Sequence, residues 1–240
     1  MKIISWNCNG AFRNKYKFIE EYKPDIVVAQ ESESPRFLNV HKKSIPCDSH
    51  VWDGELDFKG VSVFTFNGYK ASIADFYDRE FKYVLPVEIV NCDKKFLLMA
   101  VWTKFVGKFK DSYVTQAYKA VCNYEKYFDN DTVIIGDFNS NSMWNNCLSR
   151  KINHDTLVKR LDDDKFISIY HQLQKEKQGS ETVSTLYQNK KQGHGYHIDY
   201  AFLHRNMLAD VNDFKIGRYN DWHVASDHMP LFLEIKNKRY

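Results

Sequence analysis

Cysteine is scarce in this sequence, and its spacing excludes two common uses of the residue. The 240 residues include five cysteines, and no two of them form a Cys-x-x-Cys pair. They are Cys8, Cys47, Cys92, Cys122 and Cys147. An odd number of widely separated cysteines indicates neither a disulfide framework nor a zinc knuckle. A reducing compartment is therefore the expected setting, and we expect the protein to be cytoplasmic.

Long apolar runs are absent as well. No stretch approaches the roughly 20 apolar residues that span a bilayer. The first segment, MKIISWNCNG, turns polar after five residues, which is too soon for a signal peptide. No amphipathic helix or apolar loop that would dock on lipid stands out. We therefore expect no membrane partner, and the sequence carries no signal for an oligomeric state.

Glycine is sparse, with ten residues, and the glycine patterns of several enzyme classes are missing. There is no Gly-x-Ser-x-Gly elbow, no P-loop and no dinucleotide-binding fingerprint. His194 and His197 have a spacing that suits zinc, but no cysteine or acidic partner follows at ligand spacing. These absences argue against a serine hydrolase, a P-loop or dinucleotide enzyme, and a zinc site.

What the sequence does contain is enough apolar material for a full core. Hydrophobic residues make up 43% of the chain, and no internal repeat, linker or low-complexity tract divides it. We therefore predict a single domain over residues 1–240. The net charge of +3 permits a polyanionic partner without requiring one.

The segment most informative about chemistry is TVIIGDFNSN, residues 132–141. Four β-branched residues followed by glycine and polar residues predict a buried strand that ends in a loop. Asp137 and Asn139 stand at its end, and an extended chain would turn both side chains to one side. Taken alone, this pair is typical of a turn that closes a strand. A calcium loop is excluded, because Ser142 and Leu148 stand where that loop needs glycine and glutamate.

Two earlier segments place polar residues in the same way. Residues 2–6 are predicted to be a strand that ends at Asn7, and residues 25–30 a buried strand followed directly by Glu31. Open α/β sheets collect their ligands at the carboxyl ends of the strands. Asn7 and Glu31 are therefore candidates for metal or phosphate binding, although a glutamate after a strand is often only a solvated loop residue.

The rest of the chain predicts a mixture of strands, helices and two long loops. Residues 32–57 are expected to form a surface loop with a short helix, and residues 175–195 an exposed, mobile loop. Asn67-Gly68 predicts a hairpin turn between two strands. Strands are predicted at 60–66, 69–76, 83–90, 95–103, 197–204, 214–219 and 231–235, and helices from residue 12 up to Pro24, at 113–128 and at 155–161.

A third group of polar residues lies near the C-terminus. Asp199 falls inside the predicted strand 197–204, where a charged residue needs a partner. Asp227 and His228 come just before the last predicted strand. Alone, His228 would be an ordinary loop histidine, but an aspartate beside it and Asp199 elsewhere favour a catalytic role.

Six segments in order carry a resemblance to a known family: ISWNCNG, VVAQES, GVSVFT, IIGDFNS, HIDYAF and SDHMPL. They are similar to the successive motifs of the endonuclease/exonuclease/phosphatase superfamily, which includes exonuclease III, the abasic-site endonucleases and deoxyribonuclease I. The match runs from Lys2 to Ile235. The resemblance implies an α/β fold, a four-layer α/β sandwich in which two mixed β-sheets pack face to face with helices outside. The strand and helix pattern is compatible with that fold but does not by itself predict it.

The chemistry of phosphodiester hydrolysis assigns roles that agree with those of the family. A phosphodiester repels hydroxide, so a catalyst must supply positive charge and a positioned water. Glu31 and Asp227, with Asn7, offer hard oxygen ligands for Mg²⁺ or Mn²⁺. The expected reaction is hydrolysis by a metal-bound water.

Four further residues are expected to be catalytic, together with Asn7. Asp137, with Asn139 beside it, is expected to take the proton of the attacking water and to hold its geometry. His228 is expected to donate to a phosphate oxygen, and Asp199 to orient it and favour its charged form.

The sequence departs from the family pattern after residues 95–103. Many members place there a histidine or tyrosine that touches the phosphate, whereas this chain has Trp102, Thr103 and Lys104. Lys104 and Tyr113 are candidate substitutes for binding substrate. Trp144, shortly after Asn139, is a third candidate, since it could stack on a base or sugar, although a core role is equally compatible.

These observations predict a metal-dependent phosphodiesterase, with a DNA endonuclease or exonuclease as the first expectation. Loop lysines at 42–43, 104–110 and 190–191 could follow a nucleic-acid backbone. One alternative is a phosphatase or phosphodiesterase acting on a small phosphorylated molecule or lipid headgroup. A second, a non-catalytic binding module, would need broken motifs, and the motif residues are all present. The pattern leaves open DNA or RNA and endonucleolytic or exonucleolytic cutting.

Overall fold

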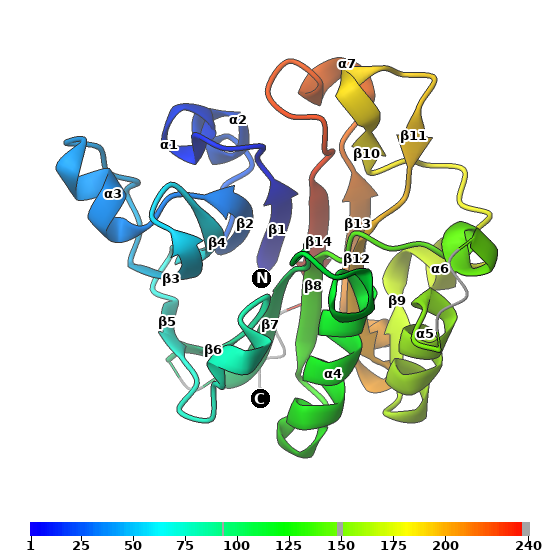
Figure 1. Ribbon diagram of the computed structural model, residues 1–240. Coiled ribbons are helices and arrows are strands. Elements are labelled where there is room, and N and C mark those ends of the chain that lie inside the picture. The colour runs from blue at the N-terminus through cyan, green and yellow to red at the C-terminus, as the bar shows by residue number, and fades with distance from the viewer. Residues whose placement is uncertain (93, 148–150, 237–240) are drawn as a thin grey trace.

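Two six-stranded β-sheets form the centre of the protein, shown in Figure 1 as a computed structural model that describes residues 1–92, 94–147 and 151–236. In order across the first sheet lie β13 (Val211–Ile216), β14 (Leu231–Ile235), β1 (Lys2–Asn7), β2 (Ile26–Ser32), β4 (Lys59–Thr65) and β3 (Ser49–Leu56). In order across the second lie β5 (Lys70–Ile73), β6 (Val84–Asn91), β7 (Lys94–Trp102), β8 (Val133–Asp137), β12 (Asp199–His204) and β9 (Phe166–Ser168). A short ribbon pairs β10 (Leu186–Tyr187) with β11 (Gly195–Tyr196).

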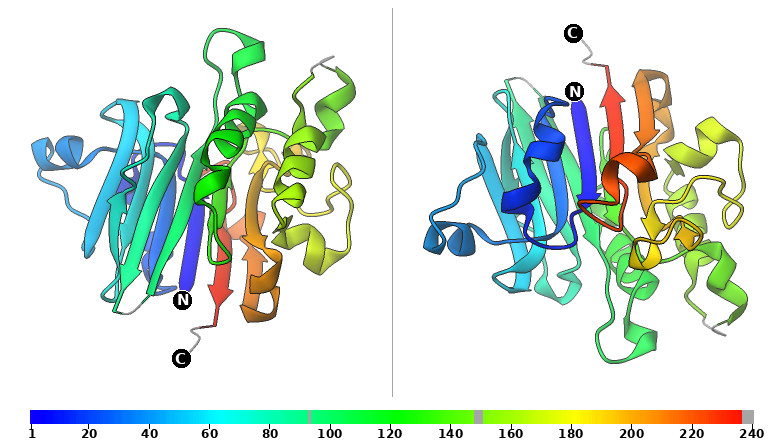
Figure 2. Two further views of the ribbon diagram at one scale, coloured as in Figure 1. Left: turned by 90° about the horizontal axis from the view of Figure 1, so that it is seen from below. Right: turned by 90° about the horizontal axis from the view of Figure 1, so that it is seen from above.

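Both sheets are mixed, and the first joins the two ends of the chain. β1 pairs in parallel with β2 and antiparallel with β14, and β7 pairs in parallel with β8. The first and last strands of the chain therefore lie side by side, as both views of Figure 2 show. Buried side chains from both sheets, including Ile3, Leu85, Ile135 and Leu233, form the core between them.

Helices cover the outer face of each sheet. Beside the first sheet lie α1 (Phe12–Lys15), α2 (Lys17–Glu20), α3 (Pro35–Val40) and α7 (Tyr219–Trp222), and beside the second lie α4 (Val114–Tyr124), α5 (His154–Asp163) and α6 (Ile169–Gln174). Figure 1 shows α1 and α2 on one side of the stacked sheets and α4 on the other. The four-layer α/β sandwich implied by the motifs is therefore confirmed.

Two sequence-based predictions about the N-terminal half are wrong. Residues 49–56 belong to strand β3 rather than to a long loop, although the short helix expected in that loop is present as α3. The Asn67-Gly68 turn does not close a hairpin, because β4 belongs to the first sheet and β5 to the second. Positive φ angles of 58° and 83° at these two residues confirm the turn itself. A local turn signal sets the direction of the chain but not the sheet that the next strand joins.

Two predictions about the C-terminal half also need correction. Asp199 is the first residue of β12 rather than an interior one, which places it where the strand begins. The 175–195 segment is not exposed throughout, because Thr185 has no exposed surface and Glu181 accepts hydrogen bonds from Asn141 and Gly179. Polar anchors of this kind carry no hydrophobic periodicity, so the sequence pattern does not predict them.

Gly136 allows β8 to approach β7 closely, just before Asp137. Its φ is +148°, and a Cβ there would lie 2.0 Å from the carbonyl oxygen of Val101. We expect Gly136→Ala to lower the free energy of unfolding by roughly 3–5 kcal/mol, because backbone strain and a clash with the main chain add together. Urea unfolding measures the change. Gly193→Ala is the matched control, since a Cβ there meets nothing within 4 Å, and equal effects in the two variants would contradict the prediction.

His154, the first residue of α5, is buried as a neutral ring. Burial lowers its pKa from 6.5 to about 4, and its two ring nitrogens contact Ser140 Oγ and Gln178 Oε1. The unfolded chain therefore binds the proton first, and stability that is complete above pH 6.5 is lost as the pH falls toward 4. Between pH 7.5 and 4.5 this one group should cost about 2.5 kcal/mol. Urea unfolding of His154→Gln across this range should show a pH dependence flatter by that amount; parallel curves would refute the assignment.

Candidate active site

The ends of three strands bring the predicted catalytic residues together. Asp137 is the last residue of β8 and Asp199 the first of β12, and the two are direct partners in the antiparallel register. Asn7 is the last residue of β1, in the other sheet, and its Nδ2 donates a hydrogen bond of 2.9 Å to Asp137 Oδ2. The site therefore lies where the ends of the two sheets meet.

Asp137 is fully buried and accepts hydrogen bonds on both carboxylate oxygens. Besides Asn7, the side chain of Asn139 donates to Oδ2 at 2.9 Å, and the Asn139 main-chain N–H donates to Oδ1 at 2.9 Å. The two side chains meet, but the extended chain on which that expectation was conditional is not found, because Asn139 has a φ of 46°. The turn itself carries the amide back to Asp137. These three donors fix the orientation of the carboxylate.

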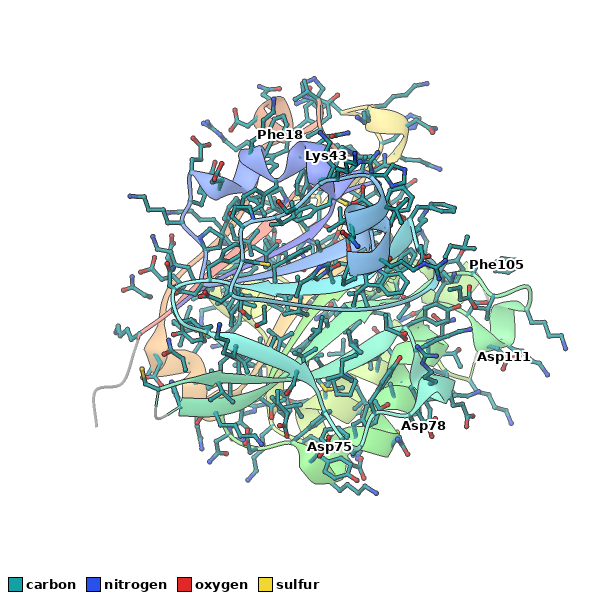
Figure 3. The ribbon with its side chains drawn as sticks, turned by 90° about the vertical axis from the view of Figure 1, so that its left-hand side faces the viewer. Phe18, Lys43, Asp75, Asp78, Phe105 and Asp111 are labelled. Atoms are coloured by element: carbon teal, nitrogen blue, oxygen red, sulfur yellow. The ribbon has the colours of Figure 1, made fainter. Side chains whose placement is uncertain are left out.

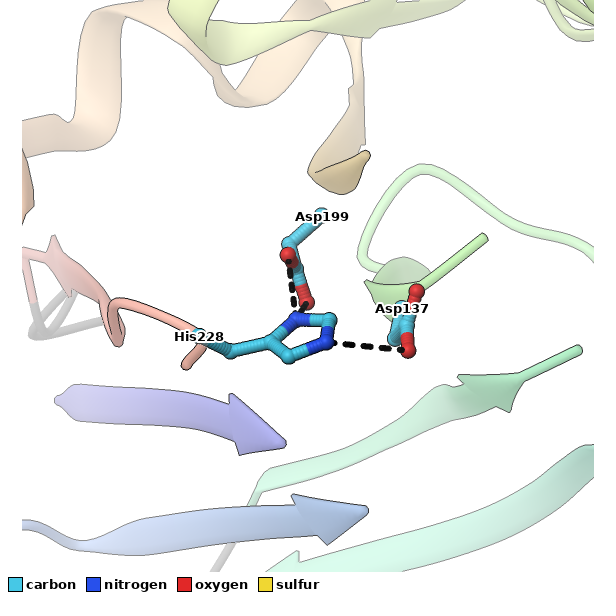
Figure 4. A group of neighbouring side chains, drawn as sticks. All are labelled: Asp137, Asp199 and His228. Atoms are coloured by element: carbon cyan, nitrogen blue, oxygen red, sulfur yellow. Dashed lines mark hydrogen bonds and ion pairs between the residues drawn. The ribbon is translucent and has the colours of Figure 1, made fainter. Parts of the chain in front are cut away.

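His228 lies between the two aspartates, as Figure 4 shows. Its Nδ1 donates to Asp199 Oδ2 at 3.0 Å, and its Nε2 lies 4.0 Å from Asp137 Oδ2. The His228 side chain is only 8% exposed. Its Nε2–H lies too far from the Asp137 carboxylate for a direct hydrogen bond, which leaves it available to another acceptor.

Burial and mutual charge shift the pKa values of this group. Burial raises the pKa of Asp137 to about 7, and the Asp199 charge adds to that effect. Burial alone would lower the pKa of His228, but the charges of Asp199 and Asp137 outweigh it and raise the pKa to about 10. The raised pKa of His228 favours the imidazolium cation at neutral pH, and the raised pKa of Asp137 makes its carboxylate a stronger base. Such values suit a donor and an acceptor of protons.

Glu31 stands in an unusual backbone conformation. Its φ is 60°, and the register of β2 against β4 shifts between Gln30 and Ser32. A bulge of this kind re-aims a side chain, and a left-handed conformation costs a non-glycine residue about 1–3 kcal/mol.

The expected metal ligands fit a divalent cation by their chemistry. Glu31 and Asp227 supply carboxylate oxygens and Asn7 an amide oxygen, the donors that Mg²⁺ prefers. Lysines already meet this negative charge: Lys59 Nζ lies 3.0 Å from Glu31 Oε2. Burial lowers the pKa of the Lys15 ammonium, whereas the charges of Asp227 and Glu31 raise it. Both carboxylates therefore act electrostatically on nearby ammonium groups.

The three residues expected to be catalytic also form a group that could hold a metal ion. One ligand atom from each of Asp137, Asp199 and His228 lies within 4.8 Å of the others. The charge of the imidazolium and the amide donors already compensate these carboxylates. Glu31, Asp227 and Asn7 therefore stay the predicted ligands on the chemistry of their oxygen donors.

The three residues expected to bind substrate fall in two places. Lys104 and Tyr113 line a cleft of about 340 Å³ that Glu31 and Asn139 also line. Trp144 packs instead against Tyr196, with ring centroids 5.3 Å apart. Lys104 and Tyr113 thus lie beside the candidate site, whereas Trp144 contacts strand β11 through Tyr196.

Several residues that support the site were missed by the sequence analysis. Ser226 donates to the Asn7 carbonyl and accepts from the His228 N–H, and Trp6 Nε1 donates to the His228 carbonyl. Thr185 Oγ1 accepts from the main-chain N–H of Asp199, and the Thr103 carbonyl accepts from Asn139 Nδ2. Ser226 could have been found from its place beside Asp227-His228. Thr185 lies in a polar stretch that offers no such signal.

Comparison with known proteins gives matches at the level of structure. No protein-family model matches the sequence, and no curated protein sequence matches it. The AP endonuclease LMAP from Leishmania major superposes with a TM-score of 0.70 at 15% identity, over 99% of this chain and 88% of that one. The 3′ phosphatase NExo from Neisseria, bound to a product DNA hairpin, gives 0.69 at 18%, over 99% and 100%. An AP endonuclease from Archaeoglobus fulgidus gives 0.71 at 15%, over 99% and 100%.

The similarity covers almost the full length of the chain and both sheets. Identities below 20% establish a shared fold and leave activity to be argued from the site itself. Within residues 1–92, 94–147 and 151–236, no helix is long and apolar enough to cross a membrane. The chain therefore has the fold of the endonuclease/exonuclease/phosphatase superfamily, as its six motifs predict.

Proposed function

We propose that this protein is a divalent-metal-dependent phosphodiester hydrolase that cuts nucleic acid, with DNA as the expected substrate. The observation that carries the proposal is the buried arrangement of Asp137, His228 and Asp199 at the meeting of two sheet ends. It joins a proton acceptor to a cationic proton donor, which is what attack of water on an anionic phosphodiester requires.

In the proposed reaction, Asp137 takes a proton from the attacking water, whose oxygen forms a new P–O bond. The ester P–O bond on the opposite side breaks, and the departing alkoxide takes its proton from solvent water. Asn7 and Asn139 hold its carboxylate in place, so little reorganisation is needed when the proton moves. His228 donates its Nε2–H to a phosphate oxygen and offsets the negative charge that develops there. Asp199 fixes the imidazole through Nδ1 and keeps it protonated.

Glu31, Asp227 and Asn7 are the residues that would hold Mg²⁺ or Mn²⁺. When bound there, the ion supplies positive charge that offsets the charge of the phosphate. The bulge at Glu31 supports this assignment, because bulges re-aim a side chain and recur next to active sites.

The choice of DNA rests on two supports. The structural neighbours include AP endonucleases and a phosphatase bound to a DNA hairpin. Exposed lysines include Lys108, on a loop, and Lys190, at the end of a short 3-10 helix, and such side chains can meet backbone phosphates.

We further propose that residues 1–240 act as one domain in a reducing, cytoplasmic compartment. The core between the sheets contains Ile3 from one end of the chain and Ile235 from the other. Cys8, Cys47, Cys92 and Cys122 are free thiols, which suits such a compartment.

The direct test is hydrolysis by the purified protein with Mg²⁺ against a substrate panel. The panel contains plasmid, single-stranded DNA, a duplex with an abasic site, RNA and small phosphate esters. We expect cleavage of at least one DNA substrate at a rate well above that of the esters. Preferential hydrolysis of a small ester would move the assignment to a phosphatase or phosphodiesterase of small molecules, and no turnover of any substrate would favour a binding module.

Salt dependence of binding supplies an independent test of the nucleic-acid substrate. Each lysine–phosphate contact releases counterions, so log affinity should fall by roughly 0.7–0.9 per contact for each tenfold rise in salt. Alanine at Lys108 and Lys190 should reduce that slope, measured with labelled DNA and an Asp137→Asn protein. Lys95→Ala is the control, because Lys95 is paired with Glu88 and lies near the other end of β7. A slope that none of these changes alters would count against a backbone contact.

A further inference from the structure

The cleft beside Glu31 has an unusual lining of lysines and aromatic rings. Lys59 Nζ lies 5.8 Å from the ring centroid of Trp102, and Lys104 Nζ lies 5.4 Å from the same centroid. Tyr113 and Phe105 also line the cleft, with their ring centroids 6.2 Å apart. A volume of about 340 Å³ is at the small end for a ligand pocket and suits one nucleotide-sized group.

The rim of the cleft is apolar and exposed. Leu56 is 54% exposed and Phe105 46%. Figure 3 shows Phe105 projecting at the edge of the molecule, on the same loop region as Asp111. An aromatic rim beside ammonium groups suits a sugar or base attached to a phosphate, because the ring can stack while the ammonium groups meet the anion.

The two lysines differ in what holds them. Lys104 pairs with Glu55 Oε2 at 2.7 Å, and Glu55 also holds Lys82, so one carboxylate is shared by two ammonium groups. Those hydrogen bonds lower the pKa of Glu55 to about 2, which keeps it ionised. Lys59 instead pairs with Glu31, the expected metal ligand. A divalent cation at Glu31 and the ammonium of Lys59 therefore compete for the same carboxylate.

We propose, on the basis of the proposed hydrolase function, that Lys59 is exchanged between Glu31 and the substrate. Its ion pair neutralises Glu31, and a divalent cation bound to that carboxylate would release Lys59 toward the cleft. With Lys104 it then forms a subsite for the phosphate of the nucleotide next to the scissile phosphate, over Trp102 and beside Phe105. The ligand class is a phosphorylated nucleotide unit of a nucleic-acid strand.

The energetics of the ion pair permit this exchange. The Lys59 side chain is 42% exposed and the Glu31 side chain 18%, and half-exposed ion pairs are weak. Metal and phosphate binding should therefore be coupled through Lys59, and by linkage each strengthens the other.

Lysine labelling followed by mass spectrometry reports the release of Lys59 directly. Adding Mg²⁺ should raise the labelling rate of Lys59 roughly two- to fivefold, the range expected when a half-exposed ion pair breaks. A 5′-phosphorylated oligonucleotide added to the Mg²⁺-loaded Asp137→Asn protein should then protect both Lys59 and Lys104. Lys95, paired with Glu88 and remote from the cleft, is the internal control and should not respond.

Binding measurements with two variants complete the test. Lys59→Met should weaken oligonucleotide binding about tenfold with Mg²⁺ present and hardly at all without it, because only the released lysine reaches the ligand. Glu31→Gln should bind the oligonucleotide more tightly than the parent without metal, since it no longer holds Lys59. Binding of a dephosphorylated oligonucleotide shows whether the 5′-phosphate is needed for binding. Binding of inorganic phosphate, measured separately, shows whether the phosphate is sufficient without the nucleotide.

Separate outcomes distinguish the exchange of Lys59 from the proposed function. Mn²⁺ binding is followed independently by electron paramagnetic resonance. If the metal binds and hydrolysis occurs, but Lys59 labelling is constant and Lys59→Met has the same effect with and without metal, the exchange is refuted while the hydrolase assignment stands. If no metal binds and no hydrolysis occurs, both are overturned.

Discussion

Asp137→Asn is expected to lower turnover by roughly two to four orders of magnitude, the usual contribution of a positioned general base. The substitution keeps the shape of the side chain but removes the group that accepts the proton. Asp137 has no exposed surface and accepts three hydrogen bonds from Asn7 and Asn139, so no water or neighbouring carboxylate can take its place without rearrangement. Single-turnover kinetics on the best substrate of the panel measure the effect.

Two controls separate chemistry from folding in that experiment. The amide NH₂ of an asparagine at this position would face an N–H donor of Asn7 or Asn139, with which it cannot form a hydrogen bond. A modest loss of stability is therefore expected, and urea unfolding measures it. Asp53→Asn is the matched variant, because Asp53 is 4% exposed and bonded to Tyr77 and Arg79 outside the site. Turnover in Asp137→Asn within tenfold of the parent would remove Asp137 from the role of base.

Removal of divalent metal should abolish hydrolysis. Chelation with EDTA is expected to lower the rate by at least roughly a thousandfold, because several kcal/mol of charge stabilisation on the phosphate are lost. Mg²⁺ or Mn²⁺ in excess should restore it, since the expected ligands are carboxylate and amide oxygens. Glu31→Gln should raise the metal concentration needed for half-maximal rate while leaving the free energy of unfolding nearly unchanged.

Thermal unfolding is the control for metal removal. Because Lys59 pairs with Glu31, the unfolding temperature in EDTA should resemble that of the untreated protein before Mg²⁺ is added. Full activity in EDTA, or restoration by Zn²⁺ alone, would contradict an oxygen-liganded Mg²⁺ or Mn²⁺ site.

The sequence predicted the strands that carry the site better than the geometry within it. The apolar run before Asp137 and the one before Glu31 are long enough to fix a buried strand, and both are found as β8 and β2. The proximity of the Asp137 and Asn139 side chains was predicted from an extended chain. It is produced instead by a left-handed turn at Asn139. Period-two reasoning holds only while the chain remains extended.

What the sequence missed depends on contacts between distant segments. Strand β3 was taken for a loop because its partly exposed residues show no clean alternation, and pairing with β4 is what holds it in the sheet. Thr185 supports Asp199 from 14 positions away, across a polar segment without periodicity. Turn signals and hydrophobic patterns are local, whereas sheet membership and polar support are decided by tertiary packing.

The pairing of β1 with β14 has a consequence for biosynthesis. Asn7 is synthesised more than 200 residues before His228 and β14, and the site requires both. A nascent chain that lacks β14 leaves one side of β1 unpaired and has no imidazole between its aspartates. The proposed nuclease therefore stays incomplete until this last strand has been made and has paired with β1.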